Sequence, residues 1–240
     1  MKINKKDILV LIPARSGSKG LPDKNIKKLH GKPLISYTIE TAQEIFDNSQ
    51  VIVSTDDLKI AKIAELKGAN IPFLRPKELA QDDSSTRDVI LHLVEFLKSK
   101  KRIPSIIVLL QATSPLRNST HLNEALKLFF QKDCDMVVSV SESKISPYFN
   151  LFEENKQGYL KKSKAGIYMR RQDVPLCYEY NGAIYIFKTK SIVKSEMKDF
   201  KKIVKYVMPK NDSIDIDDEL DWKLAEYILT KGHDDKIGNS

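Results

Sequence analysis

The chain has 240 residues, of which 41% are hydrophobic and 30% charged, a composition typical of a globular protein with a sizeable core. Lys and Arg outnumber Asp and Glu by 40 to 32, and this net charge of +8 favours an anionic partner such as nucleic acid, a membrane surface or a phosphorylated substrate. No apolar run approaches the ~20 residues that span a bilayer, and no signal-peptide pattern is present. We therefore expect one cytoplasmic domain over residues 1–240 that does not bind membranes.

Cysteine and histidine are too scattered to predict a metal or disulfide framework. Cys134 and Cys177 have no ligand-like spacing to each other or to the four histidines, so neither a zinc site nor a disulfide is expected. Of the 40 cations only 7 are Arg, the residue that binds carboxylates and phosphates with two parallel hydrogen bonds. The arginines are Arg15, Arg75, Arg87, Arg102, Arg117, Arg170 and Arg171. Each of them is a candidate anion ligand.

Strands and helices are predicted to alternate through the first 140 residues. Continuous β-branched runs bounded by turn residues predict buried strands at 8–12, 51–53, 106–110 and 136–138. Apolar residues three and four apart predict helices at 34–46, 58–67, 86–97 and 121–130. This alternation predicts an α/β fold with a mostly parallel sheet between two helical layers. Ligands of such sheets bind beyond the carboxyl ends of the strands.

The segment from about 142 to 187 differs from the rest, because it is rich in Tyr and Phe and has few helical signals. We expect loops and antiparallel strands inserted before the end of the main sheet. Its aromatic side chains are suited to a core, a sugar-stacking surface or a dimer interface, and aromatic enrichment favours the interface. A last helix is predicted from about Asp218 to Leu229.

The loop after the first predicted strand has the composition of a phosphate-binding loop. Residues 13–25 contain Gly17, Gly20, two serines, one Arg and two lysines. Glycines let the backbone approach an anion, N–H groups point at it and cations neutralise it. Neither G-x-x-x-x-G-K-[ST] nor G-x-G-x-x-G is present. The alternative is an ordinary loop with solvated lysines.

Polar motifs also follow other predicted strands. Arg75 lies in 73–76 and is either a ligand or a surface arginine, whereas 111–117 begins with a glutamine that can read a base or ribose edge. The Thr and Ser of this second motif are alternatively helix caps, and Ser119 is the expected cap of the next helix. In 170–175, one of two adjacent arginines can bind a carboxylate or phosphate.

The acidic run 212–219 predicts a metal site. If its two isoleucines face inward as a short strand, Asp215 and Asp217 share the opposite face. Such a pair suits Mg²⁺ bound also by phosphate oxygens, with Mn²⁺ as a substitute. The alternative is that these residues only cap the last helix, and we assign that role to Asp218. Asp56 and Asp57 are expected to cap or begin a helix.

Together these residues resemble the CMP-sialic acid synthetase family, the N-acylneuraminate cytidylyltransferases. The resemblance rests on the ordered motifs 12–20, 24–25, 74–76, 111–117, 171–175, 181–185 and 213–217. It implies a Rossmann-like three-layer nucleotidyltransferase fold and a homodimer in which 142–187 is the dimerisation and sugar-side insertion. It also implies transfer of CMP from CTP to the anomeric hydroxyl of an acidic nine-carbon sugar, with release of pyrophosphate and Mg²⁺ as the metal.

The same resemblance assigns individual residues. The catalytic residues it implies are Arg15, Lys24, Asp215 and Asp217, the two aspartates being the metal ligands. The implied nucleotide-binding residues are Ala14, Arg15, Ser16, Gly17, Ser18, Lys24, Asn25, Arg75 and Ser84. The implied sugar-binding residues are Gln111, Thr113, Ser114, Arg171, Asn181 and Tyr185, with Arg171 facing the sugar carboxylate.

Two departures from the family pattern bear on the acceptor sugar. Ala112 stands where many members have Pro, and Phe149 replaces a Lys of some sialic acid enzymes. The stretches 147–150 and 170–173 look more like relatives that activate legionaminic acid, and the intact Gln111-x-Thr113-Ser114-Pro115 argues against pseudaminic acid enzymes. N-acetylneuraminic acid and legionaminic acid are therefore the expected acceptors.

Other functions remain open at this point. One is a cytidylyltransferase for Kdo or pseudaminic acid, and another is a glycosyltransferase that binds its metal through Asp215-x-Asp217. A non-catalytic protein of the same fold is disfavoured by the complete motifs. Duplex nucleic acid is not an expected partner, because it explains neither the acidic pair nor the absence of a basic recognition helix.

Overall fold

The protein is built on one six-stranded sheet. The computed structural model describes residues 7–17, 20–81 and 83–237, with side chains described up to residue 231. The strands are β1 (Ile8–Pro13), β4 (Val51–Ser54), β5 (Ile106–Leu110), β6 (Met136–Glu142), β9 (Tyr178–Lys188) and β10 (Ile203–Val207). Their order is β10-β6-β9-β5-β1-β4, and β9 alone runs antiparallel to its neighbours. The predicted α/β fold with a mostly parallel sheet is confirmed.

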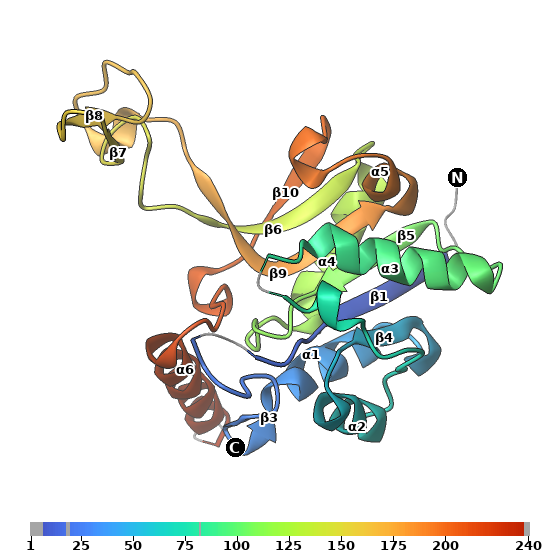
Figure 1. Cartoon of the computed structure of the whole chain (residues 1–240). Helices are drawn as coiled ribbons and strands as arrows, with labels where there is room; N and C mark the ends of the chain where they lie inside the picture. Colours follow the sequence, from blue (N-terminus) through green and yellow to red (C-terminus); the bar gives the residue numbers. More distant parts are fainter. Residues whose placement is uncertain (1–6, 18–19, 82, 238–240) are drawn as a thin grey trace.

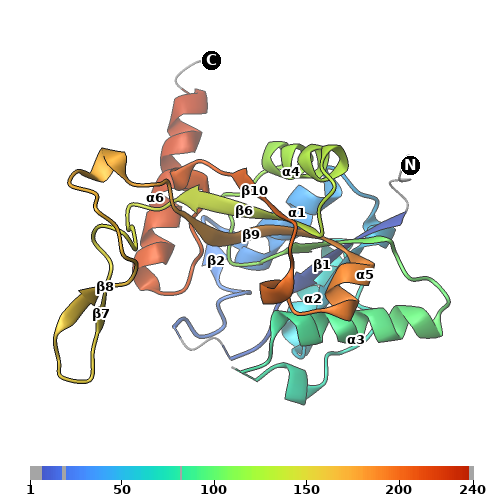
Figure 2. The ribbon, with the colours of Figure 1, turned by 90° about the horizontal axis from the view of Figure 1, so that it is seen from above.

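Helices cover both faces of this sheet (Figure 2). They are α1 (Leu34–Gln43), α2 (Leu58–Leu66), α3 (Thr86–Ser99), α4 (Ser119–Gln131), α5 (Thr189–Lys194) and α6 (Glu219–Ile237). Successive β1 residues point to opposite faces, so Val10 packs with α1, α2 and α4, whereas Leu11 packs with α3 and α5. The four strands and four helices predicted before residue 140 are therefore present, with ends shifted by a few residues.

Strand direction determines where the polar loops meet. Because β1, β4, β5, β6 and β10 run the same way, their following loops gather at one edge of the sheet. The antiparallel strand β9 begins at that edge, close to a register shift opposite Val138 and Val140. All the predicted motifs except the segment around Arg171 therefore converge there.

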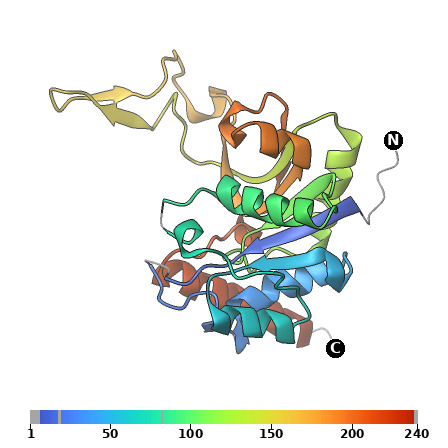
Figure 3. The ribbon, with the colours of Figure 1, turned by 45° about the vertical axis from the view of Figure 1, so that its right-hand side comes forward.

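The predicted insertion forms an arm, residues 143–177, that projects from the body (Figures 1 and 3). It carries a hairpin of β7 (Phe152–Glu154) and β8 (Leu160–Lys162). Ile167 and Met169 are 96% and 89% exposed, so the arm has no core of its own in this chain. An isolated two-stranded hairpin is at best marginally stable in water, and exposed apolar side chains are suited to contact with another surface.

A small third core joins the two ends of the fold. The hairpin of β2 (Lys28–Leu29) and β3 (Lys32–Pro33) contributes Leu29, which packs with Ile216 and with Trp222 of α6. This cluster fixes the loop after β1 against the segment between β10 and α6. Among the described residues, no helix is long and apolar enough to cross a membrane.

Local capping agrees with the sequence at two of three helix starts. Asp57 accepts hydrogen bonds from the Lys59 and Ile60 N–H groups at the start of α2, and Asp218 caps α6 in the same way. The prediction for Ser119 was wrong, because the side chain of Asn118 caps α4 by accepting from the His121 N–H at 3.1 Å. The helix starts two residues before the span 121–130 that its apolar periodicity indicates.

We expect Asn118→Ala to lower the free energy of unfolding by about 1 kcal/mol, because it leaves an N–H group of the first turn without its acceptor. Ser119→Ala, one residue along, is the matched control and is expected to change it by less than half as much. Urea unfolding of both variants measures the difference, and equal losses would contradict the assignment.

Candidate active site

A cavity of about 640 Å³ opens at the edge where the loops meet. Its walls come from the loop after β1, the segment leading into α3, the loop after β5, β9, and the segment between β10 and α6. The predicted residues that line it are Arg15, Lys24, Asn25, Arg75, Ser84, Gln111, Thr113, Tyr185, Asp215 and Asp217. Residues 100 to 200 positions apart in the sequence thus share one cavity.

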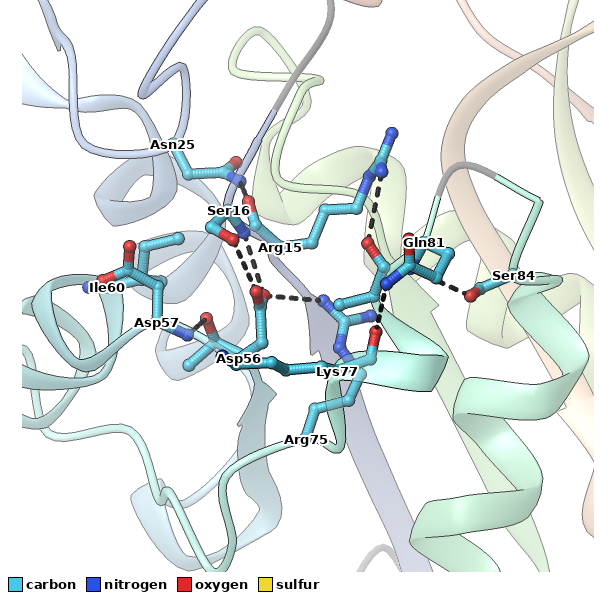
Figure 4. A network of polar contacts seen from close by, with 12 residues as sticks. Arg15, Ser16, Asn25, Asp56, Asp57, Ile60, Arg75, Lys77, Gln81 and Ser84 are labelled. Atoms are coloured by element: carbon cyan, nitrogen blue, oxygen red, sulfur yellow. Dashed lines mark hydrogen bonds and ion pairs between the residues drawn. The ribbon is translucent and has the colours of Figure 1, made fainter.

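The loop after β1 is held by Asp56 (Figure 4). The Asp56 carboxylate accepts from the Ser16 N–H at 2.9 Å and from the Ser16 hydroxyl. The Asn25 side-chain amide donates to the Arg15 carbonyl at 2.9 Å. The prediction that Asp56 begins a helix was therefore wrong, since its carboxylate fixes the loop while Asp57 makes the cap.

The other small residues of this loop support its shape. Ala14 is buried and its N–H donates to the Ser54 carbonyl, and Gly17 has a φ of +67°, which favours glycine. Neither of these residues nor Ser16 lines the cavity. Ser18 lies outside the described residues. The implied nucleotide contacts of Ala14, Ser16 and Gly17 are thus not made by side chains that face the cavity.

Two arginines lie on the side of the cavity next to α3. Arg75 is buried, and its Nη2 lies 3.8 Å from Asp56 Oδ1 while its Nε and Nη2 have no hydrogen-bond acceptor among the described residues. Arg15 Nη1 donates to the Ala80 carbonyl at 3.3 Å (Figure 4). Burial lowers the pKa of Arg75, and Asp56 opposes this effect. A buried cation with unused donors is suited to binding an acceptor-rich ligand.

The Asp56 carboxylate remains ionised in this environment. Burial alone would raise its pKa, but the hydrogen bonds from Ser16 and the positive charge of Arg75 outweigh burial and lower it.

Ser84 also lines the cavity. Its hydroxyl donates to the Glu78 carbonyl at 3.0 Å and accepts from the Gln81 N–H. Gln81 also lines the cavity and was not predicted.

Lys24 joins the first loop to the acidic segment. Its side chain is 8% exposed, and its ammonium donates to the Ile216 carbonyl and to Asp217 Oδ1, the latter at 3.2 Å. Gly20 packs so closely on this segment that a Cβ there would lie 2.1 Å from the Asp217 carbonyl oxygen. This contact requires glycine and brings a cation beside the carboxylates.

The acidic segment is an extended loop and not the expected strand. The Ile216 N–H donates to the Thr113 carbonyl at 2.9 Å, but no ladder of such bonds forms. Ile216 is buried as predicted, Asp215 is partly buried and the Asp217 side chain is 80% exposed. The segment is fixed by its small core and by Lys24, with both carboxylates at the cavity.

The carboxylate pair fits a divalent cation. Asp215 Oδ1 is buried and lacks a hydrogen-bond partner among the described residues, and Gly182 leaves room for its Oδ2 at a point where a Cβ would lie 2.7 Å away. Burial raises the pKa of Asp215, the Asp217 charge adds to the rise, and Thr113 and Lys24 oppose it. A bound cation would relieve both effects.

Two aspartates alone leave most coordination positions of a cation to other ligands. Among the described residues, no three His, Cys, Asp or Glu side chains are grouped so that they could hold a metal. A cation on this pair would therefore take further ligands from water or from a bound phosphate. Mg²⁺ commonly binds in this way, with one or two carboxylates and substrate oxygens.

Arg117 is a residue that sequence reasoning did not place in the site. It is 2% exposed and donates to the carbonyls of Gln111 and Ala183 at 3.1 and 2.9 Å and to the Thr38 hydroxyl at 2.6 Å. Burial lowers its pKa to about 9, and the charge of Asp215 opposes that effect. Arg117 thus holds the backbone of Gln111, a lining residue, without lining the cavity itself, which its place at the end of a motif does not reveal.

The predicted sugar side is only partly assembled. Gln111, Thr113 and Tyr185 line the cavity, and burial raises the pKa of Tyr185 to about 12, so its hydroxyl stays protonated. Asn181 instead accepts from the Ser139 hydroxyl at 2.6 Å and donates to Ser213 at 2.9 Å behind the wall. Ser114 is fully buried and does not reach the cavity.

Arg171 does not line the cavity of its own chain. It begins a short 3-10 turn of the arm, is exposed, and donates to the Lys144 carbonyl at 2.9 Å. It borders a separate cavity of about 380 Å³ within the arm. The expectation that Arg171 joins the other sugar-side residues therefore fails within one chain, because the arm projects away from the sheet edge (Figure 1).

We expect Asp215→Asn to stabilise the metal-free protein at pH 7, because the folded state disfavours the ionised carboxylate. The raised pKa means that this penalty is full above the folded pKa and disappears below the ordinary value of 3.8, so the gain should shrink as the pH falls towards 4.

Melting temperatures in chelator between pH 4 and 8 measure this effect. Asp217→Asn is the control, since its exposed carboxylate pairs with Lys24 and its loss should not stabilise the fold. A destabilised Asp215→Asn protein at pH 7 would contradict the prediction.

Comparison with known proteins identifies the family of this chain. The profile of the family described as cytidylyltransferase matches residues 9–230. The chain is 38% identical over 232 residues to N-acylneuraminate cytidylyltransferase of Escherichia coli O18:K1:H7, covering 96% of this chain and 54% of that protein.

Two Campylobacter jejuni relatives match over nearly their full length. Identity is 35% to pseudaminic acid cytidylyltransferase, with 94% of this chain and 97% of that protein covered. Identity is 34% to CMP-N,N′-diacetyllegionaminic acid synthase, with 93% and 95% covered.

The fold is shared with more distant structures. CMP:2-keto-3-deoxy-manno-octonic acid synthetase superposes with a TM-score of 0.67 at 18% identity, covering 94% of this chain and 99% of that one. The profile covers most of this chain, and two relatives above 30% identity are covered almost completely. The protein belongs to the cytidylyltransferase family.

Proposed function

We propose that the protein transfers CMP from CTP to the anomeric hydroxyl of a nonulosonic acid and releases pyrophosphate. The observation that carries this proposal is one cavity lined by Arg15, Lys24 and the Asp215–Asp217 pair. The named relatives act on pseudaminic, legionaminic and N-acylneuraminic acids, which supports the substrate class.

The chain's own residues bind and orient the two substrates. Arg15 and Lys24 neutralise the phosphates and stabilise charge that develops on the α-phosphate and the leaving pyrophosphate. Arg75, with unused donors, and Ser84 hold the nucleoside on the side next to α3. Gln111 and Tyr185 face the acceptor sugar across the cavity. Catalysis is then chiefly positioning and charge neutralisation.

The residues for a metal are Asp215 and Asp217. When bound, Mg²⁺ or Mn²⁺ supplies charge neutralisation at phosphate oxygens and lowers the pKa of a coordinated hydroxyl. Asp215 fits this role because its Oδ1 is buried without a partner and its charge is disfavoured in the metal-free fold. Lys24 keeps Asp217 in place beside it.

N-acetylneuraminic acid and legionaminic acid are the acceptors that we propose first. The stretches 147–150 and 170–173 support legionaminic acid, and the intact Gln111-x-Thr113-Ser114-Pro115 motif argues against pseudaminic acid. Overall similarity does not choose among acceptors, since the relatives of three acceptor types are 34–38% identical. Pseudaminic acid and Kdo are the alternatives. Each candidate carries a carboxylate, which an arginine binds bidentately.

We further propose that two chains form a dimer in which each arm completes the partner's cavity. The exposed apolar arm supports this arrangement, because its surface has no partner in one chain. Arg171 would then bind the sugar carboxylate at the cavity of the other chain. This arrangement would explain why a residue of a sugar-side motif lies outside its own site.

The activity is tested by mixing the protein and Mg²⁺ with each nucleoside triphosphate and each of four acidic sugars. We expect pyrophosphate and a CMP-sugar only from CTP, with N-acetylneuraminic or legionaminic acid as the best acceptor. Asp217→Asn and Arg15→Ala should each lower kcat/KM at least 100-fold, because both remove charge stabilisation. Lys59→Ala, which changes an exposed side chain of α2, is the control. Near-normal turnover of Asp217→Asn at saturating Mg²⁺ would refute the metal assignment.

Arm exchange is tested by mixing two inactive variants. Arg171→Ala keeps its own cavity, and Asp217→Asn keeps its own arm, so a mixed dimer contains one intact site. After unfolding and refolding together, we expect about a quarter of the wild-type activity. No recovery above the sum of the separate variants would show that Arg171 does not serve the partner's cavity.

A further inference from the structure

His121 is a buried histidine that none of the roles above uses. It lies in the first turn of α4 and is 6% exposed. Its Nδ1 accepts a hydrogen bond from the Asn118 N–H at 3.3 Å, and its Nε2 lies 3.4 Å from Asp212 Oδ2. The ring therefore spans from the loop after β5 to the turn that precedes the acidic segment.

The contacts of the ring fix its tautomer. Because Nδ1 accepts from a backbone N–H, the proton of the neutral imidazole is on Nε2, which faces the Asp212 carboxylate. Burial lowers the pKa of His121, whereas Asp212 and Glu124 oppose this effect, so the ring is neutral at physiological pH. The neutral ring thus presents one N–H to a carboxylate.

Asp212 stands at the entrance to the acidic segment. It ends a 3-10 turn, Lys210–Asp212, and Asp215 follows three residues later. On the other side, Ile216 is held by its N–H bond to the Thr113 carbonyl. The upstream anchor of Asp215 consists of the 3-10 turn and of the Ser213 hydroxyl, which accepts from the Asn181 amide at 2.9 Å, and the segment forms no strand ladder. A shift of the upstream anchor would move the Asp215 carboxylate.

We propose that His121 is a positioning residue that, through Asp212, holds the Asp215 loop in the geometry that binds a divalent cation with CTP. The inference rests on the metal role proposed for Asp215. The imidazole acts on that role as a fixed donor, in the way that outer partners orient the ligands of a metal site. It contacts neither substrate in this arrangement.

Two isosteric variants separate the two ring nitrogens. In His121→Gln the amide NH₂ lies where Nε2 was and can still donate to Asp212. In His121→Asn the side-chain oxygen can accept from the Asn118 N–H, but no donor reaches Asp212. The affinity for Mn²⁺ in the presence of CTP is measured on the full chain by water-proton relaxation. This readout does not depend on turnover. Thermal melts confirm that each variant is folded.

We expect His121→Asn and Asp212→Ala to weaken Mn²⁺ binding about 10-fold each, with no further loss in the double variant. His121→Gln should bind close to the wild type. Tyr206→Phe, which removes the 2.6 Å bond from Tyr206 to Glu124 beside the ring, is the control that loses stability without losing affinity.

Asp215→Asn in the same titration separates the positioning role of His121 from the metal role of Asp215. If it abolishes Mn²⁺ binding while folded His121→Asn binds like the wild type, or if His121→Gln loses as much as His121→Asn, the positioning role is wrong and the metal site stands. If Asp215→Asn binds Mn²⁺ normally, the metal assignment fails, and the inference that depends on it fails too.

Discussion

The Lys24 ammonium group lies where the loop after β1 meets the segment between β10 and α6, and its two contacts join regions nearly 200 residues apart in sequence. With a side chain only 8% exposed, this cation is held by the Ile216 carbonyl and the Asp217 carboxylate. The small core around Trp222 supports the same junction from below. This contact and that core together bring the glycine-containing loop after β1 beside the carboxylate pair.

The site is built from charges that the fold alone does not fully compensate. Arg75 has buried donors without acceptors, Arg117 is buried with two carbonyls and a hydroxyl as partners, and Asp215 has a buried oxygen without a partner. Arg75 and Asp215 line the cavity, where ligands of opposite charge would supply the missing partners. A triphosphate with a divalent cation brings both signs of charge at once, which is the physical basis of the proposed function.

The rigid sheet and the exposed arm position different residues of the proposed site. Loops at the carboxyl edge are held by buried strands, and the nucleotide-side residues are fixed by short bonds such as that of Asp56 to Ser16. The arm has exposed apolar residues and carries Arg171 away from its own cavity. In the proposed dimer, the acceptor would be recognised partly by the partner's arm, whereas the residues proposed for the nucleotide all come from one chain.

The sequence by itself determined the buried strands and the motifs that follow them, because continuous β-branched runs bounded by turns have few alternative structures. It did not reveal β10, an edge strand with alternating exposure, or that β9, expected as an antiparallel strand of the insertion, lies between β6 and β5 in the main sheet. Only the tertiary structure showed that Asp56 binds Ser16, that buried Arg117 binds the Gln111 and Ala183 carbonyls, and that Arg171 lies outside the cavity. These roles depend on which distant groups lie next to each side chain, and that proximity arises from packing, which local residue patterns do not encode.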